Sequence, residues 1–389
     1  MSARAEDHTS AAPAPVRPPR VAIASVGDPE SSGTWSGVTA GIFDAMRELG
    51  VIVSGLDTAL APGLEQAMLV GAAAPTRNRY DAHGAALTMR VRGLVAARRM
   101  ARGDLDGVVQ IGTNFALPAA GAPYVTLEDM TLRQGAGAHP VFSRMSAQGI
   151  AGWERRRARI YGGARMCAAA SHWTADSLIA DYGLARERVA VVGFGATHTS
   201  PSPARAWSPP RFLFVGLDWE RKGGPLLLRA FARVREILPE ATLDVVGGHP
   251  PLSQAGVTAH GVLSQSRAQE RELMLELFAR ATCLVVPSLA EPFGIVYVEA
   301  GSTGIPSIVS SEGGGRDAIG AHGGAVVDAG DERGLVEAML RLADAETARG
   351  MGEAARVRSE LYTWTKVAER LLRALGLHAP DGRPLAEFL

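Results

Sequence analysis

The fold is decided by a stretch in the middle of the chain, RFLFVGLDWERKGGPLLLRAFARVREIL at residues 211–238. Its apolar start, residues 211–215, predicts a buried strand, and the run from Pro225 onward has helical periodicity with a proline in its first turn. A polar loop containing Arg221 and Lys222 lies between the two. Strand, loop and helix in this order form the unit from which parallel sheets covered by helices are built.

The same alternation extends through most of the chain. It predicts an α/β fold of two Rossmann-like, doubly wound domains facing each other across a central cleft, with ligands bound at the carboxyl ends of the strands. In the first half, strands are expected at residues 21–26, 107–111, 124–127, 166–170 and 189–192, and helices at 38–49, 150–162 and 171–181. In the second half, further strands are expected at 241–246, 283–287 and 307–310, and helices at 267–281, 295–303 and 365–375.

Changes in composition mark the domain boundaries. Residues 196–210 contain four prolines and interrupt the alternation, which predicts a linker. Residues 1–19 are small, polar and proline-rich, which predicts a disordered tail. We therefore expect a first domain over residues 20–195 and a second over 211–364, followed by a terminal helical segment at 365–389.

Charge and composition exclude several classes of function. Forty basic residues balance forty acidic ones among the 389, whereas a protein that coats nucleic acid needs a large positive excess. No apolar run approaches the ~18 residues of a membrane helix, and the start of the chain lacks the pattern of a signal peptide. A cytoplasmic protein is therefore expected, with at most peripheral membrane contact. Cys167 and Cys283 are predicted to be buried free thiols.

Arg221 and Lys222 are the first candidates for a functional site. They lie at the carboxyl end of a predicted strand and just before a helix, a position where paired cations suit the oxygens of a diphosphate. A solvated surface pair is the alternative. Lysine is rare in this chain, with Lys366 the only other example, and this scarcity favours a functional role for Lys222.

A second candidate region is CLVVPSLAEPFGIVYVEA at residues 283–300. It predicts a buried strand, a short loop and a helix that Gly294 opens, and the first N–H groups of such a helix can bind phosphate. Glu291 lies in the loop, free to meet a polar ligand. Glu299 lies in the first turns of the helix, where a carboxylate can accept hydrogen bonds from a ribose diol. The alternative for Glu299 is that it only complements the helix dipole.

Two glycine-containing loops and two arginine-rich stretches carry weaker signals. The turn at residues 310–317 allows close approach of backbone to a ligand, but a flexible turn is an equal alternative. The loop at 31–37 lacks the Gly-Lys-Ser/Thr of a P-loop. The stretches at 90–102 and 153–157 could contact an anionic membrane or an acidic acceptor, but solvated helix faces are the favoured interpretation.

Together these motifs resemble the retaining nucleotide-sugar glycosyltransferases of family 4, which have the GT-B fold. The resemblance rests on the Arg-Lys-Gly loop and on two glutamates eight positions apart (299 − 291) around Pro-Phe-Gly. In the first half, Trp-Ser-Gly37 is similar to the first glycine loop of that family. The segment from Ala170 is similar to the end of its acceptor domain.

The resemblance implies a role for each matched residue. Arg221 and Lys222 would neutralise the leaving diphosphate, Glu291 would hold a hydroxyl of the donor sugar, and Glu299 would hold the ribose. Asp129, which follows the strand at 124–127, would lie near the reacting sugar, although the neighbouring Glu128 could take that place. The remaining expected donor-binding residues are Gly37, Gly216, Phe293, Gly294, Ile295 and Val296.

The implied activity is transfer of a sugar from a nucleoside diphosphate sugar to an acceptor hydroxyl, with retention of configuration. The first domain would take the acceptor, the second would bind the nucleotide sugar, and the terminal segment would cross back onto the first. No metal or other cofactor is expected, since no Asp-x-Asp motif or histidine cluster is present to hold one. Alternatives are an epimerase or phosphorylase of the same fold, or a noncatalytic nucleotide-sugar-binding protein. The acceptor and the oligomeric state stay open.

Overall fold

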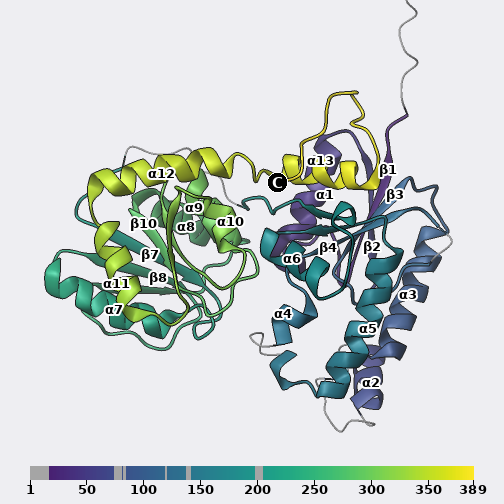
Figure 1. Cartoon of the computed structure of the whole chain (residues 1–389), viewed down its shortest axis with the longest axis horizontal. Coiled ribbons are helices and arrows are strands. Elements are labelled where there is room, and N and C mark those ends of the chain that lie inside the picture. The colour runs from purple at the N-terminus through teal and green to yellow at the C-terminus, as the bar shows by residue number, and fades with distance from the viewer. Residues whose placement is uncertain (1–16, 74–80, 82–84, 119–120, 137–141, 198–204) are drawn as a thin grey trace, which may run out of the picture.

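The computed structural model describes residues 17–73, 81, 85–118, 121–136, 142–197 and 205–389. Most of the expected tail and the middle of the expected linker, residues 198–204, lie outside the described residues. The described chain forms two α/β domains, each built on one six-stranded parallel sheet (Figure 1). Among the described residues, no helix is both long enough and apolar enough to span a membrane.

The N-terminal sheet has the strand order β2-β1-β3-β4-β5-β6. Its central strands are largely apolar and almost completely buried, as expected for strands that are covered on both faces. Helices α1 and α13 pack on one face, and α3, α5 and α6 pack on the other. The elements are β1 (Arg20–Ser25), η1 (Thr34–Gly37), α1 (Val38–Glu48), β2 (Ile52–Asp57), α2 (Pro62–Ala73), α3 (Ala86–Met100), β3 (Gly107–Ile111), β4 (Tyr124–Glu128), α4 (Leu132–Ala136), η3 (Phe142–Arg144), α5 (Ala147–Gly163), β5 (Met166–Ala169), α6 (His172–Ala180), η4 (Arg186–Arg188) and β6 (Val189–Val191).

The C-terminal sheet has the order β12-β11-β10-β7-β8-β9, so that β7 and β10 are neighbours at its centre. The first helix, α7, shows why the sequence folds as it does: Pro225 lies in its first turn, and Leu227, Phe231 and Val234 point from one face into the core. The elements are β7 (Arg211–Gly216), α7 (Gly224–Ile237), β8 (Thr242–Gly247), β9 (Val257–Gly261), α8 (Ala268–Arg280), β10 (Cys283–Val286), α9 (Ile295–Ser302), β11 (Ser307–Ser310), α10 (Gly315–Ile319), β12 (Gly324–Val327), α11 (Glu332–Arg341), α12 (Ala345–Ser359) and α13 (Trp364–Leu375).

The chain passes between the domains twice, and the second passage leaves α13 on the N-terminal domain (Figure 1). This helix contacts α1 and the strands β3, β4 and β5. Arg370, which is 2% exposed, anchors it: Nη1 donates to the carbonyls of Val192 and Leu361 at 2.9 Å each, and Nε donates to the carbonyl of Glu387 at 2.7 Å. One guanidinium therefore joins the end of β6, the start of α13 and the C-terminal segment.

We expect Arg370→Met to lower the free energy of unfolding by about 3 kcal/mol, because three carbonyls lose a buried, charged donor. The measurement is the urea midpoint of the N-terminal domain, followed by circular dichroism. The matched control is Arg349→Met at an exposed position of α12, which should change stability by less than about 0.5 kcal/mol. Equal midpoints for the two variants would contradict the anchoring role of Arg370.

Candidate functional site

A cavity of about 920 Å³ lies between the two domains. Its walls come from the loops that follow β1 and β4 in one domain and β7 and β10 in the other, together with side chains of α3 and α5. These loops are at the carboxyl ends of the strands, where doubly wound folds bind ligands. The lining includes nine of the expected site residues: Asp129, Gly216, Arg221, Lys222, Glu291, Phe293, Gly294, Ile295 and Val296.

Lys222 is held against Glu291 in an ion pair inside the cavity wall. Its side chain is 13% exposed and that of Glu291 is 7% exposed. Gly216 at the end of β7 permits this approach, since a Cβ there would lie 2.9 Å from Cγ of Lys222. Ser288 Oγ donates to the same carboxylate oxygen at 3.1 Å. Both contacts use Oε2 of Glu291, and Glu291 also lines the cavity, so its contact with a polar ligand stays a prediction.

Arg221 is fixed beside this pair. Its Nε lies 3.2 Å from Oδ2 of Asp218, and its Nη1 donates to the carbonyl of Ala290 at 2.9 Å. Two positive side chains from one loop thus line the cavity next to the loop that follows β10. The helix α9 begins there with Gly294 in the left-handed conformation, φ 80°. The first N–H groups of α9 form the positive end of its helix dipole. They belong to Ile295 and Val296, which line the cavity.

Two expected donor-binding residues do not line the cavity. Glu299 is buried in α9, with 9% exposure, and its carbonyl accepts from Ser302 Oγ at 2.8 Å. Gly37 caps α1 with φ 85°, and its neighbours Ser36 and Val38 provide the lining instead. The contact of Glu299 with ribose and that of Gly37 with donor stay predictions.

The glycine-rich turn at residues 310–317 packs against protein backbone. A Cβ at Gly313 would collide with the carbonyl oxygen of Glu291. The turn also pairs with the loop between β10 and α9, residues 287–294, which is called the donor loop. Glu291 N donates to Glu312 O at 3.1 Å, and Gly314 N donates to Glu291 O at 2.9 Å. The close approach that these glycines allow therefore holds the loop of Glu291 in place.

On the N-terminal side, two adjacent carboxyls follow β4. Glu128 is 1% exposed, and its Oε1 accepts from Thr113 Oγ1 at 2.7 Å and from the Tyr161 hydroxyl at 3.3 Å. Burial raises the pKa of Glu128. Burial, reinforced by the charge of Glu128, raises the pKa of Asp129 from 3.8 to about 6. Both residues line the cavity, and Asp129 is the more accessible of the two; its place near the reacting sugar stays a prediction.

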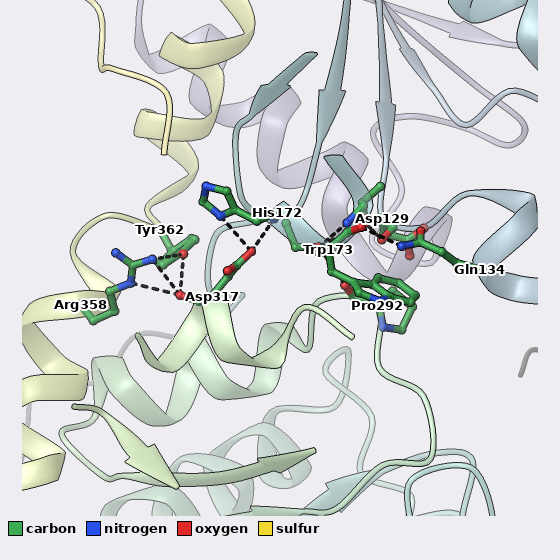
Figure 2. A network of polar contacts seen from close by, with 10 residues as sticks. Asp129, Gln134, His172, Trp173, Pro292, Asp317, Arg358 and Tyr362 are labelled. Carbon is green, nitrogen blue, oxygen red and sulfur yellow. Dashed lines mark hydrogen bonds and ion pairs between the residues drawn. The ribbon is translucent and has the colours of Figure 1, made fainter. Parts of the chain in front are cut away.

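Polar contacts across the domain boundary position this side of the cavity (Figure 2). The His172 backbone N–H donates to Asp317 Oδ2 at 2.5 Å, and the His172 ring lies 3.2 Å from the same oxygen. The carbonyl of Asp317 accepts from the Tyr362 hydroxyl at 2.7 Å. At the other end of the network, Thr174 Oγ1 donates to the carbonyl of Asp129. The start of α6 therefore links the Asp129 loop to the C-terminal domain.

The arginine-rich stretches are only partly solvated. Arg92 on α3 and Arg157 on α5 are 7% and 5% exposed, and both line the cavity. The expectation of solvated faces is wrong for these two, because each lies on the inward face of its helix. For Arg157 that face also carries Trp153, 3% exposed, and Ile160, 4% exposed. The four-residue spacing of Trp153 and Arg157 places both side chains on one face of the helix, which could have indicated that Arg157 is buried. The three other arginines of the same helix made this spacing hard to recognise.

Among the described residues, no three His, Cys, Asp or Glu side chains gather in a way that could hold a metal ion. Cys167 and Cys283 are free and buried.

The family model for glycosyl transferases group 1 matches residues 209–345. This part of the chain is similar to a group 1 glycosyltransferase domain. It holds Arg221, Lys222, Glu291 and the start of α9, so it contributes the C-terminal half of the cavity. The family resemblance that the motifs carry is thereby confirmed.

Named relatives match the chain over part of its length. A D-inositol 3-phosphate glycosyltransferase of Segniliparus rotundus is 30% identical over 173 residues, which are 41% of this chain and 38% of that protein. A mannosylfructose-phosphate synthase of Agrobacterium fabrum is 29% identical over 246 residues, or 55% of this chain and 53% of that protein. The chain thus spans about two fifths to one half of the length of these curated relatives.

Solved structures match nearly the whole chain. Sucrose-phosphate synthase of Thermosynechococcus elongatus has a TM-score of 0.67 at 18% identity, over 91% of this chain and 98% of that one. WaaG, a glycosyltransferase involved in lipopolysaccharide biosynthesis, has a TM-score of 0.61 at 16% identity, over 90% and 99%. These matches and the two parallel sheets show the GT-B fold, as the sequence predicts.

In the C-terminal domain, we expect Lys222→Met to lower the free energy of unfolding at pH 7 by about 3 kcal/mol, because it leaves Glu291 buried and unpaired. Adding Glu291→Gln should recover much of this loss, since the uncompensated charge is then removed. Urea unfolding of the wild type, both single variants and the double variant measures the coupling. Additive losses in the double variant would contradict the ion pair.

Asp129→Asn should stabilise the protein at neutral pH. The pKa of Asp129 is raised in the folded state to about 6, so folding favours its protonated form. Its stabilising contribution is complete below about pH 4 and is lost as the pH rises through 6. The variant should therefore gain about 2 to 3 kcal/mol on the wild type between pH 4 and pH 7.5. Asp176→Asn, at an exposed position of α6, is the control, and a gain that does not change with pH would contradict the assignment.

Proposed function

We propose that the protein is a glycosyltransferase that moves a sugar from a nucleoside diphosphate sugar to an acceptor hydroxyl. The observation that carries this proposal is the pairing of Arg221 and Lys222 beside the start of α9, inside a cavity that both domains line. The similarity of residues 209–345 to group 1 glycosyltransferases supports the same activity.

The donor would lie along the C-terminal wall. Arg221 and Lys222 face the cavity from the loop after β7, and the N–H groups of Ile295 and Val296 face it from the start of α9. Two cationic side chains and two backbone N–H groups thus line this wall, and the anionic oxygens of a diphosphate can accept hydrogen bonds from them. The sugar would then lie toward Glu291, whose ion pair with Lys222 places a carboxylate at the sugar–phosphate junction.

The reaction follows from the charges. When the bond between the sugar C1 and the phosphate oxygen breaks, its electron pair stays on the diphosphate and positive charge develops on the sugar ring. Preorganised cations at the leaving oxygen lower this barrier, as oxyanion-binding groups do in general. The acceptor oxygen then forms the new bond to C1, and its proton passes to the leaving phosphate.

We further propose that configuration is retained and that no metal is needed. Family 4 enzymes, which the motifs resemble, react with same-face attack, and Arg221 and Lys222 supply the charge that a divalent cation would otherwise supply. Asp129 would contact the sugar or the acceptor from the opposite wall, because it lines the cavity from the N-terminal domain. As a carboxylate it can accept a hydroxyl proton in a hydrogen bond.

The test is incubation with ADP-, GDP-, UDP- and dTDP-sugars, followed by measurement of thermal stabilisation, nucleotide release and glycosylated product. Lys222→Met should lower turnover by about 100- to 1,000-fold, the cost of removing one donor from an oxyanion site. The matched control is Lys366→Met, because the only other lysine bonds the carbonyl of Glu360 at 2.7 Å, away from the cavity. Turnover should be unchanged by a chelator, and the product should keep the anomeric configuration of the donor.

Binding of no nucleotide sugar and no nucleoside diphosphate would overturn the proposed activity. Binding without transfer to any acceptor would favour a noncatalytic nucleotide-sugar-binding protein. Release of an isomerised sugar nucleotide, or of a sugar phosphate when inorganic phosphate is the acceptor, would point to an epimerase or a phosphorylase.

A further inference from the structure

We propose that the N-terminal wall of the cavity is a binding site for an oxyanion, and that the acceptor is a phosphate monoester whose phosphate binds to Arg157. This inference rests on the proposed function, since it names the class of acceptor. The observation behind it is an excess of buried hydrogen-bond donors on the inward faces of α3 and α5.

Arg157 is the centre of this site. It is 5% exposed and lines the cavity. Its Nε and Nη1 are buried and have no hydrogen-bond partner among the described residues. The guanidinium lies over the ring of Trp153, 4.8 Å from the ring centroid to Cζ, so stacking fixes its plane. A buried donor without a partner is unfavourable, and more so when it is charged, and an oxyanion in the cavity would remove this cost.

Two further donors line the same wall. Trp153 Nε1 and Arg92 Nε are buried and also have no partner in the described part of the chain. The position of Arg92 is fixed by an ion pair, because its Nη2 lies 2.5 Å from Glu65 Oε1. The unpaired atoms are all donors, and they belong to three side chains on two helices. A guanidinium binds a tetrahedral oxyanion better than a neutral hydroxyl, because charge-assisted and bidentate hydrogen bonds are the stronger ones.

Arg157 Nε and Nη1 donate no hydrogen bond to the carboxyl groups on this wall. Glu128 Oε1 is used by Thr113 and Tyr161. Asp129 is the second acid whose charge acts on Arg157. Arg157 therefore keeps donor atoms for a ligand, although both acids contribute to the electrostatic field around it.

The site is separate from the proposed diphosphate site and has aromatic rings beside it. Arg157 belongs to the N-terminal domain, whereas Arg221 and Lys222 belong to the C-terminal one. Phe142 stands edge-on to Trp153, with ring centroids 5.5 Å apart, and both line the cavity. An acceptor that carries both a ring and a phosphate would thus place its phosphate on Arg157 and its hydroxyls toward Asp129.

The test uses inorganic phosphate as the probe, with the diphosphate site already filled. The protein is first saturated with whichever of ADP, GDP, UDP or dTDP binds, and phosphate is then titrated at constant ionic strength while thermal stability and heat of binding are measured. We expect phosphate to stabilise the wild type and to leave Arg157→Gln unaffected. Arg157→Gln should still bind the nucleoside diphosphate with the affinity of the wild type. The control is Arg159→Gln, an exposed arginine of the same helix, which should respond to phosphate as the wild type does.

A second variant covers the case in which Arg157→Gln does not fold. Trp153→Phe keeps an aromatic ring under the guanidinium but removes the indole N–H, and it should weaken phosphate binding several-fold. With a transferable donor, matched pairs of sugars with and without a 6-phosphate complete the test. The phosphorylated member should have the lower KM, and Arg157→Gln should remove this advantage while leaving the KM for the donor unchanged.

The proposal is overturned if phosphate does not bind the nucleotide-saturated wild type, or if Arg157→Gln binds it equally well. In either case Arg157 would serve only to balance the charges of Glu128 and Asp129. Acetate binding as tightly as phosphate would overturn the choice of a phosphate over a carboxylate. If no nucleoside diphosphate binds while phosphate binding still depends on Arg157, the anion site stands and the proposed sugar transfer fails.

Discussion

The ion pair between Lys222 and Glu291 is the constraint on which the rest of the site depends. Lys222 follows β7 and Glu291 follows β10, and these strands are neighbours in the C-terminal sheet. Because both side chains are largely buried, neither charge can lose its partner without a large desolvation cost. The pair therefore joins two loops at the carboxyl edge of the sheet, and Arg221 adds a second link between them through the carbonyl of Ala290.

This constraint reaches the other domain through the donor loop. Phe293 lies two positions after Glu291, and its ring packs 5.4 Å from Phe194 and 5.6 Å from Tyr362, measured between centroids. Phe194 and Tyr362 lie where the chain passes between the domains. The conformation of the donor loop and the relative placement of the two domains thus depend on one set of aromatic contacts, and the contact of His172 with Asp317 lies beside it (Figure 2).

Much of the fold could be predicted because buried parallel strands are short apolar runs. The strands Gly107–Ile111 and Ser307–Ser310 lie where the pattern predicts them. Strand β2 (Ile52–Asp57) was not predicted, because it is an edge strand in which only Leu56 is buried. An edge strand with one buried residue has neither an apolar run nor a clear alternation to recognise.

The sequence by itself determined most of the buried strands, the position of the cation loop and the resemblance of residues 209–345 to group 1 glycosyltransferases, because these depend on residues close together in the chain. Only the tertiary structure decided which partners the charged side chains have. It paired Glu291 with Lys222, 69 residues away, and it turned Arg157 into the cavity while Arg155 and Arg159 of α5 are exposed. The physical reason is that hydrophobic periodicity is local, whereas the burial of a charge depends on packing between elements that are distant in the sequence.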